Sequence, residues 1–308
     1  MSDIESKASE LIQDRKVMER LLTAEKKRRG AGTGLTFVGV HNVAQHWWCT
    51  QQAVLKSRAN ELMFFAVYLQ DRIGYAHRLG LIDKLPRRGE ALLDIGREIT
   101  LADVEMLRRQ TPKKPADVEV YYSAFDTVDK GGKPVRYIHP DQPKEMKRDF
   151  EREAAARNVR IGDVEEHPLM RGMFFHSSRA EWHPTVRWNF PWRTYTVVGE
   201  PDGLTEEFVY EYKSTRNRYL MNFVKPVAIA QADLYGYFFQ RQKKRVQIEI
   251  GEESNTDTYE QPVDRARAEE TLTAFAGVDR GERPHLPKPW KCRSCDFRVT
   301  CSVSQASK

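Results

Sequence analysis

The chain has 308 residues, of which 40% are hydrophobic and 31% are charged. That balance is typical of a folded soluble protein, and no apolar run approaches the roughly 20 residues that a membrane-spanning helix needs. The formal net charge of +6 is compatible with a polyphosphate partner, although a run of basic residues is more often a solvated helix face. The N-terminus has no basic segment followed by an apolar one, so we expect a cytoplasmic protein without a secretory signal.

The first part of the chain is predicted to be mainly helical. Residues 2–29 place apolar side chains at helical spacing behind a capping box of Ser2 and Glu5, and a glycine-rich segment ends this helix. A short extended stretch follows at residues 36–40. A second helix is predicted from about residue 43 through residue 55, and more helix between residues 61 and 109.

The pattern changes between residues 111 and 167, where prolines and glycines interrupt short segments. We interpret this stretch as an insertion. Within it, residues 118–138 are predicted to form a hairpin, and residues 144–157 an exposed, charged helix.

A small sheet is predicted after this insertion. Short runs rich in β-branched and aromatic residues indicate strands at residues 186–190, 194–199, 207–213 and 246–250. Helices are predicted before the last strand, over residues 227–245, and after it, over residues 265–276. Strands and helices that alternate in this way favour an α/β fold.

Charged side chains are concentrated at the turn Pro201-Asp202-Gly203 and in the strand segment Glu211-Tyr212-Lys213. Because side chains alternate along a strand, Glu211 and Lys213 point to one face. Asp202 lies in the turn after the preceding strand, so a hairpin would bring its carboxylate beside Glu211. Taken alone, the pair of Glu211 and Lys213 is also typical of the solvent side of an amphipathic strand.

Two converging carboxylates and a nearby backbone carbonyl, that of Tyr212, suit a hard divalent cation such as Mg²⁺ or Mn²⁺. Such an ion lowers the pKa of a bound water and polarises a phosphodiester oxygen. Lys213 would orient that water or stabilise charge on the phosphate. The expected reaction is phosphodiester hydrolysis.

The Pro-Asp turn followed by Glu-x-Lys resembles the PD-(D/E)XK nucleases. The resemblance implies that Asp202, Glu211 and Lys213 are the metal-binding acids and the lysine of the catalytic site.

Two further matches are similar to the RecB-like branch of this family. Gln231 and Tyr235 fit its Q-x-x-x-Y pattern, which implies contact with DNA. Gly172 and His176 fit its G-x-x-x-H pattern, which implies that His176 is a metal ligand. Weaker candidates for the same role are His77 and Glu98.

Three cysteines lie close together near the C-terminus, at Cys292, Cys295 and Cys301, and Cys49 lies far upstream. Three thiols in so short a stretch are rarely needed for packing, and thiolates favour zinc or iron–sulfur chemistry. A four-cysteine zinc site usually has its second pair close together as well. This asymmetry favours a cluster, with zinc as the alternative.

The cysteine pattern resembles a subset of RecB-like nucleases that includes the CRISPR-adaptation nucleases and the AddB nuclease domain. In these, one cysteine before the core and C-x2-C-x5-C after it hold a [4Fe–4S] cluster, which implies the same role for the four cysteines here. The cluster would then clasp the N- and C-terminal regions together. Trp47 and Trp48 would either pack around it or stack on a DNA strand.

The resemblance implies an α/β fold with a PD-(D/E)XK, restriction-endonuclease-like core, in which a small, mixed, mostly antiparallel sheet is flanked by helices. We divide the chain into an N-terminal helical region (1–110), the insertion (111–167), the nuclease core (168–260) and a C-terminal helix with the cysteine region (261–308).

The expected protein is a Mg²⁺- or Mn²⁺-dependent deoxyribonuclease, an exonuclease that acts on DNA ends or single strands, with helicase or CRISPR-adaptation proteins as possible partners. One alternative is a DNA-end-binding subunit of a helicase–nuclease or CRISPR integration complex. Another is a zinc-stabilised endonuclease.

Overall fold

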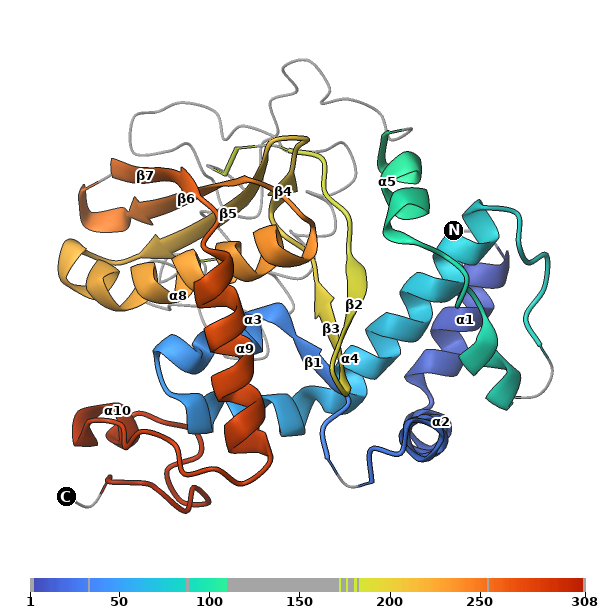
Figure 1. The fold of residues 1–308 in the computed structure, drawn as a ribbon, viewed down its shortest axis with the longest axis horizontal. Helices are drawn as coiled ribbons and strands as arrows, with labels where there is room; N and C mark the ends of the chain where they lie inside the picture. Colours follow the sequence, from blue (N-terminus) through green and yellow to red (C-terminus); the bar gives the residue numbers. More distant parts are fainter. Residues whose placement is uncertain are drawn as a thin grey trace, which may run out of the picture. The chain divides into compact units, whose positions relative to one another are not determined.

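The computed structural model of this chain describes residues 3–32, 34–86, 89–109, 172, 176, 180–181, 183–253 and 255–306. These residues form a mixed α/β protein with small sheets flanked by helices, as the sequence predicts (Figure 1). Contacts divide the chain into two compact units. Unit 1 comprises Met1–Gln110, Val186–Glu200 and Arg265–Lys308, and unit 2 comprises Thr111–Thr185 and Pro201–Asp264. The sequence-based division into four regions stays a prediction.

Unit 1 begins with two helices, α1 (Asp3–Gln13) and α2 (Arg15–Arg29), where the sequence analysis expects one. That prediction is wrong at Asp14. Its backbone is extended, and its carboxylate accepts hydrogen bonds from two N–H groups of the first turn of α2. An aspartate that caps a new helix competes with continuation of the old one. Gly30, with φ of 65°, ends α2 as predicted.

The next elements are β1 (Phe37–Gly39), α3 (Val40–Ala44), the 3-10 helix η1 (Gln45–Trp47) and α4 (Thr50–Arg78). The predicted extended stretch is confirmed, but the single helix over residues 43–55 is wrong. Cys49 has φ of −166° and is the residue before α4, so the chain extends between two helical segments. Hydrophobic spacing alone does not reveal such a break. The further helical segments are η2 (Gly89–Asp94) and α5 (Leu101–Arg109).

Unit 1 contains a three-stranded sheet in the order β1, β3 (Tyr195–Gly199), β2 (Trp188–Trp192). β3 pairs parallel with β1 and antiparallel with β2. The long helix α4 packs on β1 and on α9 (Arg265–Asp279), and side chains such as Phe37 and Phe65 are fully buried between these elements. Burial of such apolar surface is the main stabilising contribution to this unit.

Unit 2 contains a four-stranded sheet in the order β4 (Gly203–Leu204), β5 (Phe208–Thr215), β6 (Lys243–Ile250), β7 (Asn255–Pro262). β4 and β5 form an antiparallel hairpin, and β5 and β6 are parallel. Parallel neighbours need a crossover connection, which α8 (Arg218–Phe238) provides while it packs on both strands (Figure 1). The short helix η4 (Gly251–Glu253) connects β6 to β7.

The strands predicted at residues 186–199 and 207–213 are confirmed, but they belong to two sheets instead of one. A strand pattern shows which face is apolar and does not name the partner strand. β7 was not predicted. It is an edge strand whose side chains are mostly exposed, so it lacks an apolar face that periodicity can detect.

The helix predicted over residues 227–245 is displaced from α8 at both ends. α8 starts earlier because Asn217 caps it, with its Oδ1 accepting a hydrogen bond of 3.1 Å from the N–H of Leu220. The predicted start at residue 227 directly follows Pro226, which lies inside the helix. The C-terminal end is also wrong, because residues 243–245 belong to β6.

Several predicted features lie outside the described residues or side chains, namely the insertion over residues 111–167 with its hairpin and helix, and the capping box of Ser2 and Glu5. Within the part of the chain that the structure describes, no helix is both long enough and apolar enough to span a membrane.

Candidate active site and cysteine pocket

Asp202 lies beside β5, as the sequence predicts, but the predicted hairpin partner is wrong: β5 pairs with the short strand β4, which was not predicted, and β3 belongs to the other sheet. Gly203 pairs with Tyr210 across the hairpin. The Oδ2 atom of Asp202 accepts a hydrogen bond of 2.7 Å from the backbone N–H of Tyr212. Gly203 allows a close approach, because a Cβ at this position would lie 2.4 Å from the Cβ of His183. The hairpin therefore fixes one carboxylate next to the strand that carries the other.

Glu211 and Lys213 form an ion pair on the same side of β5. Glu211 is fully buried, at 0% exposed, whereas the Lys213 side chain is 32% exposed. A solvent-facing strand would leave both side chains exposed, so this burial disfavours the surface interpretation of the pair. Tyr210 and Tyr212 alternate with them and belong to a buried cluster.

His176 is connected to Asp202. Its Nε2 lies 2.9 Å from the Oδ1 of Asp202, and its ring lies edge-on to Tyr212 with 5.8 Å between the ring centres. The structure therefore brings His176 together with the three residues of the Pro-Asp and Glu-x-Lys motifs, all within unit 2. The other two candidate ligands, His77 and Glu98, belong to unit 1.

In this site two carboxylates, Asp202 and Glu211, contact the ring of His176 and the ammonium group of Lys213 respectively. Burial raises the pKa of Glu211 to about 8, against the effect of Lys213. Burial would lower the pKa of Lys213, but Glu211 and Asp202 raise it. For Asp202, burial acts to raise the pKa, yet His176 and Lys213 lower it overall. Burial would also lower the pKa of His176, and Asp202 raises it.

One oxygen of the Glu211 carboxylate has no partner among the described residues. Its Oε2 is buried and accepts no hydrogen bond there. A buried carboxylate oxygen is costly unless a cation or a donor binds it. Two carboxylates and an imidazole are types of ligand that can bind Mg²⁺ or Mn²⁺. However, the described side chains include no ready-made group of three His, Cys, Asp or Glu ligands, and Lys213 and His176 are bound to oxygens that an ion would take.

The pair predicted to contact DNA lies together on α8. Gln231 and Tyr235 are 6% and 3% exposed, and the Nε2 of Gln231 donates a hydrogen bond of 3.4 Å to the Tyr235 hydroxyl. Their four-residue spacing places them on one helix face, as expected. Their contact with DNA stays a prediction, as does the role of the Tyr212 carbonyl.

A polar network on the Tyr210 side of β5 was not predicted from the sequence. The carboxylate of Glu181 accepts hydrogen bonds from Arg245 and Gln247 and is bonded to the ring of His183. The backbone N–H of Glu181 donates to the Tyr210 hydroxyl, which donates to Gln247 Oε1 at 2.6 Å. The alternation of Arg245 and Gln247 along β6 is a signal in the sequence, but nothing in the pattern around Glu181 identifies it as their partner.

All four cysteines line one pocket in unit 1. The pocket lies between the start of α4 and the C-terminal segment that contains α10 (Pro289–Arg293). Cys292 is buried, the other three are half-buried, and all are free thiols. Burial raises the pKa of Cys49 and of Cys301, and nearby cysteines add to both shifts.

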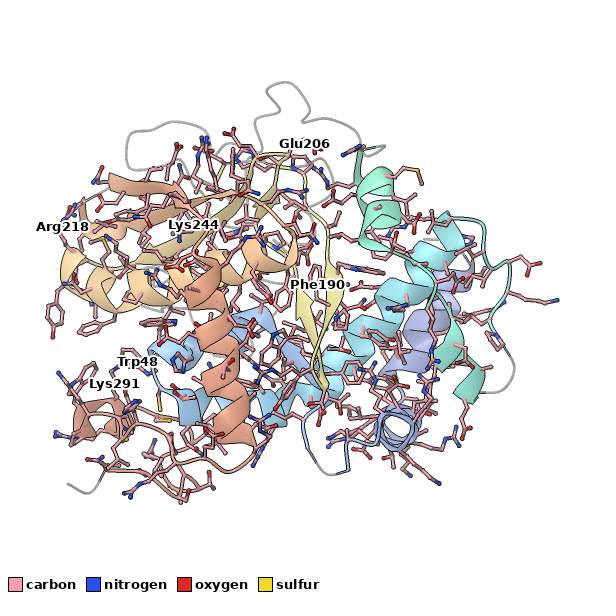
Figure 2. The ribbon with its side chains drawn as sticks, viewed as in Figure 1. Trp48, Phe190, Glu206, Arg218, Lys244 and Lys291 are labelled. Atoms are coloured by element: carbon pink, nitrogen blue, oxygen red, sulfur yellow. The ribbon has the colours of Figure 1, made fainter. Side chains whose placement is uncertain are left out.

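Trp48 and Lys291 join the two sides of this pocket, although 243 positions separate them in the chain. The Nζ of Lys291 donates a hydrogen bond of 2.9 Å to the Trp48 carbonyl and lies 4.3 Å from the centre of the Trp48 ring (Figure 2). Thiols from distant segments meet at this pocket, and thiolates are the type of ligand that a zinc or iron–sulfur centre takes. As at the carboxylates, the described residues are not grouped as a ready-made ion site.

No family model and no curated protein matches this chain. A solved structure, the crystal structure of SSO0001, is similar to it with a TM-score of 0.34 and 18% sequence identity. The similarity covers 51% of this chain and 81% of that chain. A likeness at this TM-score does not identify a function.

Proposed function

We propose that this protein is a divalent-metal-dependent nuclease with a core of the PD-(D/E)XK type, which hydrolyses phosphodiester bonds in DNA. The observation that carries the proposal is the fully buried Glu211 carboxylate, which is paired with Lys213 and keeps one oxygen without a partner among the described residues. Burying such a group costs free energy, and a strand with a purely structural role gains nothing from it. Binding a cation next to Asp202 explains it.

The roles of the residues follow from their positions. Asp202 and Glu211 would hold Mg²⁺ or Mn²⁺, with His176 and the Tyr212 carbonyl as further ligands. The ion would supply Lewis acidity and a bound water of lowered pKa. Lys213 is partly open to solvent and can donate a hydrogen bond to that water or to a phosphate oxygen. The N–H of Tyr212 orients the Asp202 carboxylate.

We also propose that Cys49, Cys292, Cys295 and Cys301 hold a [4Fe–4S] cluster. Their position around one pocket supports this, because thiolates are the ligands that such a cluster takes. Binding would link the start of α4 to the C-terminal segment and stabilise unit 1. Visible absorbance together with iron, sulfide and zinc analysis distinguishes a cluster from zinc.

DNA cleavage tests the nuclease proposal. End-labelled single-stranded, duplex and circular DNA are incubated with Mn²⁺, Mg²⁺ or EDTA. The wild type should cut only with a metal ion, and Asp202→Ala and Lys213→Ala should each slow cleavage by about 100-fold or more. Glu207→Ala is the matched control, because this acid just before β5 is exposed and paired only with Lys243 in the described contacts. Wild-type rates for both site variants would refute the site.

The same assay separates the enzyme from a DNA-end-binding subunit. Binding of DNA ends without cleavage under any metal condition would favour the subunit. Cleavage of linear but not circular DNA would identify an exonuclease. DNA as the substrate, and helicase or CRISPR-adaptation proteins as partners, are implied by the resemblance of the motifs and are part of the proposal.

A further inference from the structure

An exposed aromatic ring lies next to the cysteine pocket in unit 1. Trp290, on α10, is 41% exposed, although tryptophan is highly buried on average. Its ring meets that of Trp48 edge to face, with 5.4 Å between their centres. Trp48 also lines the cysteine pocket. Trp290 is therefore supported from one side while a large part of its surface stays open to solvent.

Positive charges surround this ring in the sequence. Lys288, Arg293 and Arg298 are exposed, and the segment 288–298 contains a single acid, Asp296. Within the described contacts, none of these three cations forms an ion pair. Exposed arginines elsewhere in the chain do form them, for example Arg58 with Asp279 and Arg218 with Glu253. The three cations therefore keep their charge available for an anionic ligand.

Lys291 has a different role from these three cations. Its ammonium group donates to the Trp48 carbonyl and lies 5.7 Å from the centre of the Trp290 ring. It is half-buried and holds the two tryptophans in place by cation–π contact. The aromatic platform is thus built on a fixed support before any ligand arrives, which lowers the entropy that binding has to overcome. Figure 2 shows Lys291 beside Trp48.

We propose that this surface binds single-stranded nucleic acid, with a base stacked on Trp290 and neighbouring phosphates held by Lys288, Arg293 and Arg298. A single strand exposes the flat faces of its bases, which a duplex hides, and stacking on an aromatic ring accepts any base. Exposed cations close to the ring in the sequence suit the phosphate backbone. The inference rests on the proposed function for the nature of the substrate, and it specifies single strands as the form that this surface selects.

Binding is measured on the full chain carrying Asp202→Asn, in EDTA, with labelled oligothymidine and with a duplex of the same length. Trp290→Ala should weaken single-strand binding by about 5- to 150-fold. Trp290→Phe keeps an aromatic face and should stay within about threefold of the parent. Lys288→Gln combined with Arg293→Gln should reduce the slope of log K against log salt by about 1.4, since each contact with a single strand contributes about 0.7.

Arg15→Gln is the charge control, because it removes an exposed cation of α2 that is paired with Glu19. It should change neither affinity nor salt slope. Equal binding by Trp290→Ala and its parent, or tighter binding of the duplex, overturns the proposal. Cleavage by the chain with Asp202 intact is assayed separately. Loss of binding in Trp290→Ala with no cleavage by the intact chain supports the surface and refutes the nuclease, whereas cleavage with unchanged Trp290→Ala binding refutes the surface alone.

Discussion

Among single residues, Glu211 forms an ion pair whose two partners differ in burial. Its carboxylate is fully buried, while the side chain of its partner Lys213 is about one-third exposed. The two ends of this ion pair are therefore not equivalent. Without Glu211, the ammonium group of Lys213 can turn to water. Without Lys213, the carboxyl group stays in a low-dielectric environment close to Asp202.

This asymmetry predicts different stabilities for two variants in EDTA. Lys213→Met should lower the free energy of unfolding by about 1–3 kcal/mol more than Glu211→Gln does, because it leaves a buried acid without its main donor. Urea unfolding of both variants and the wild type measures the difference. Both variants should be inactive as nucleases, so they should differ in the free energy of unfolding and not in activity. Equal stabilities, or a larger loss in Glu211→Gln, would contradict this description of the pair.

The site residues differ in how far the sequence determined them. Asp202, Glu211 and Lys213 were predictable because the order of a turn and the alternation of a strand place their side chains. The burial of Glu211 was not, since alternation assigns a face and does not show what covers it. Glu181 was missed because it lies outside the strands while most of its partners lie on β5 and β6. Its contacts depend on the tertiary fold, which periodicity does not encode.

Among the elements, α8 follows directly after the strand that carries Glu211 and Lys213, so its start sets how the chain leaves the site. Its apolar second half is evident from the sequence, whereas its first turns were not predicted. Asn217 was the available signal, because asparagine is a preferred helix-capping residue. Pro226 lies within α8, so the predicted start at residue 227 falls inside the observed helix.

The cap at Asn217 predicts a graded effect of substitution. Asn217→Ala removes the acceptor for the N–H of Leu220 and should lower the free energy of unfolding by about 1 kcal/mol. Asn217→Gly should lower the free energy of unfolding by only about a few tenths of a kcal/mol, since glycine leaves the backbone free to be solvated. Urea unfolding followed by far-UV circular dichroism distinguishes the two. A glycine variant less stable than the alanine variant would argue against a capping role.

A buried ion pair joins α8 to β6. Lys244 and Asp233 are paired with side chains 2% and 0% exposed, and Asp233 also accepts a hydrogen bond of 2.7 Å from the N–H of Asp264. Asp233→Ala would leave a buried ammonium without a counter-charge. It should lower the free energy of unfolding by about 3–5 kcal/mol.

Two further variants show whether uncompensated charge is the cause. Asp233→Leu combined with Lys244→Met should recover much of that loss, because neither charge then remains buried. The adjacent pair of Lys243 and Glu207 is a matched control, with side chains 60% and 61% exposed. Lys243→Ala should leave stability unchanged within error. A double variant as unstable as Asp233→Ala would mean that packing, not charge, accounts for the loss.

For the whole molecule, the sequence predicted the α/β class and most strands, but not how they are grouped. Each compact unit is assembled from separate stretches of the chain. β3 pairs with β2 and with β1, which lies far earlier in the sequence, and not with β5, which follows soon after it. Pairing between distant segments depends on side-chain complementarity across the sheet, and a local pattern does not contain that information.

The cysteine pocket brings Cys49 together with the three C-terminal cysteines in unit 1, which the resemblance of the cysteine pattern to RecB-like nucleases implies. If a metal centre binds there, it links the start of α4 to the segment after α9, and its binding free energy adds to the stability of unit 1.

Cys49→Ser and Cys292→Ser should therefore both lose bound metal and unfold at a lower temperature than the wild type. Ser304→Ala is the control, because Ser304 lines the same pocket without a thiol. Metal content, visible absorbance and thermal unfolding are measured on anaerobically purified protein. Zinc in place of iron and sulfide would keep the site and reject the cluster, and unchanged metal content in both cysteine variants would reject the site itself.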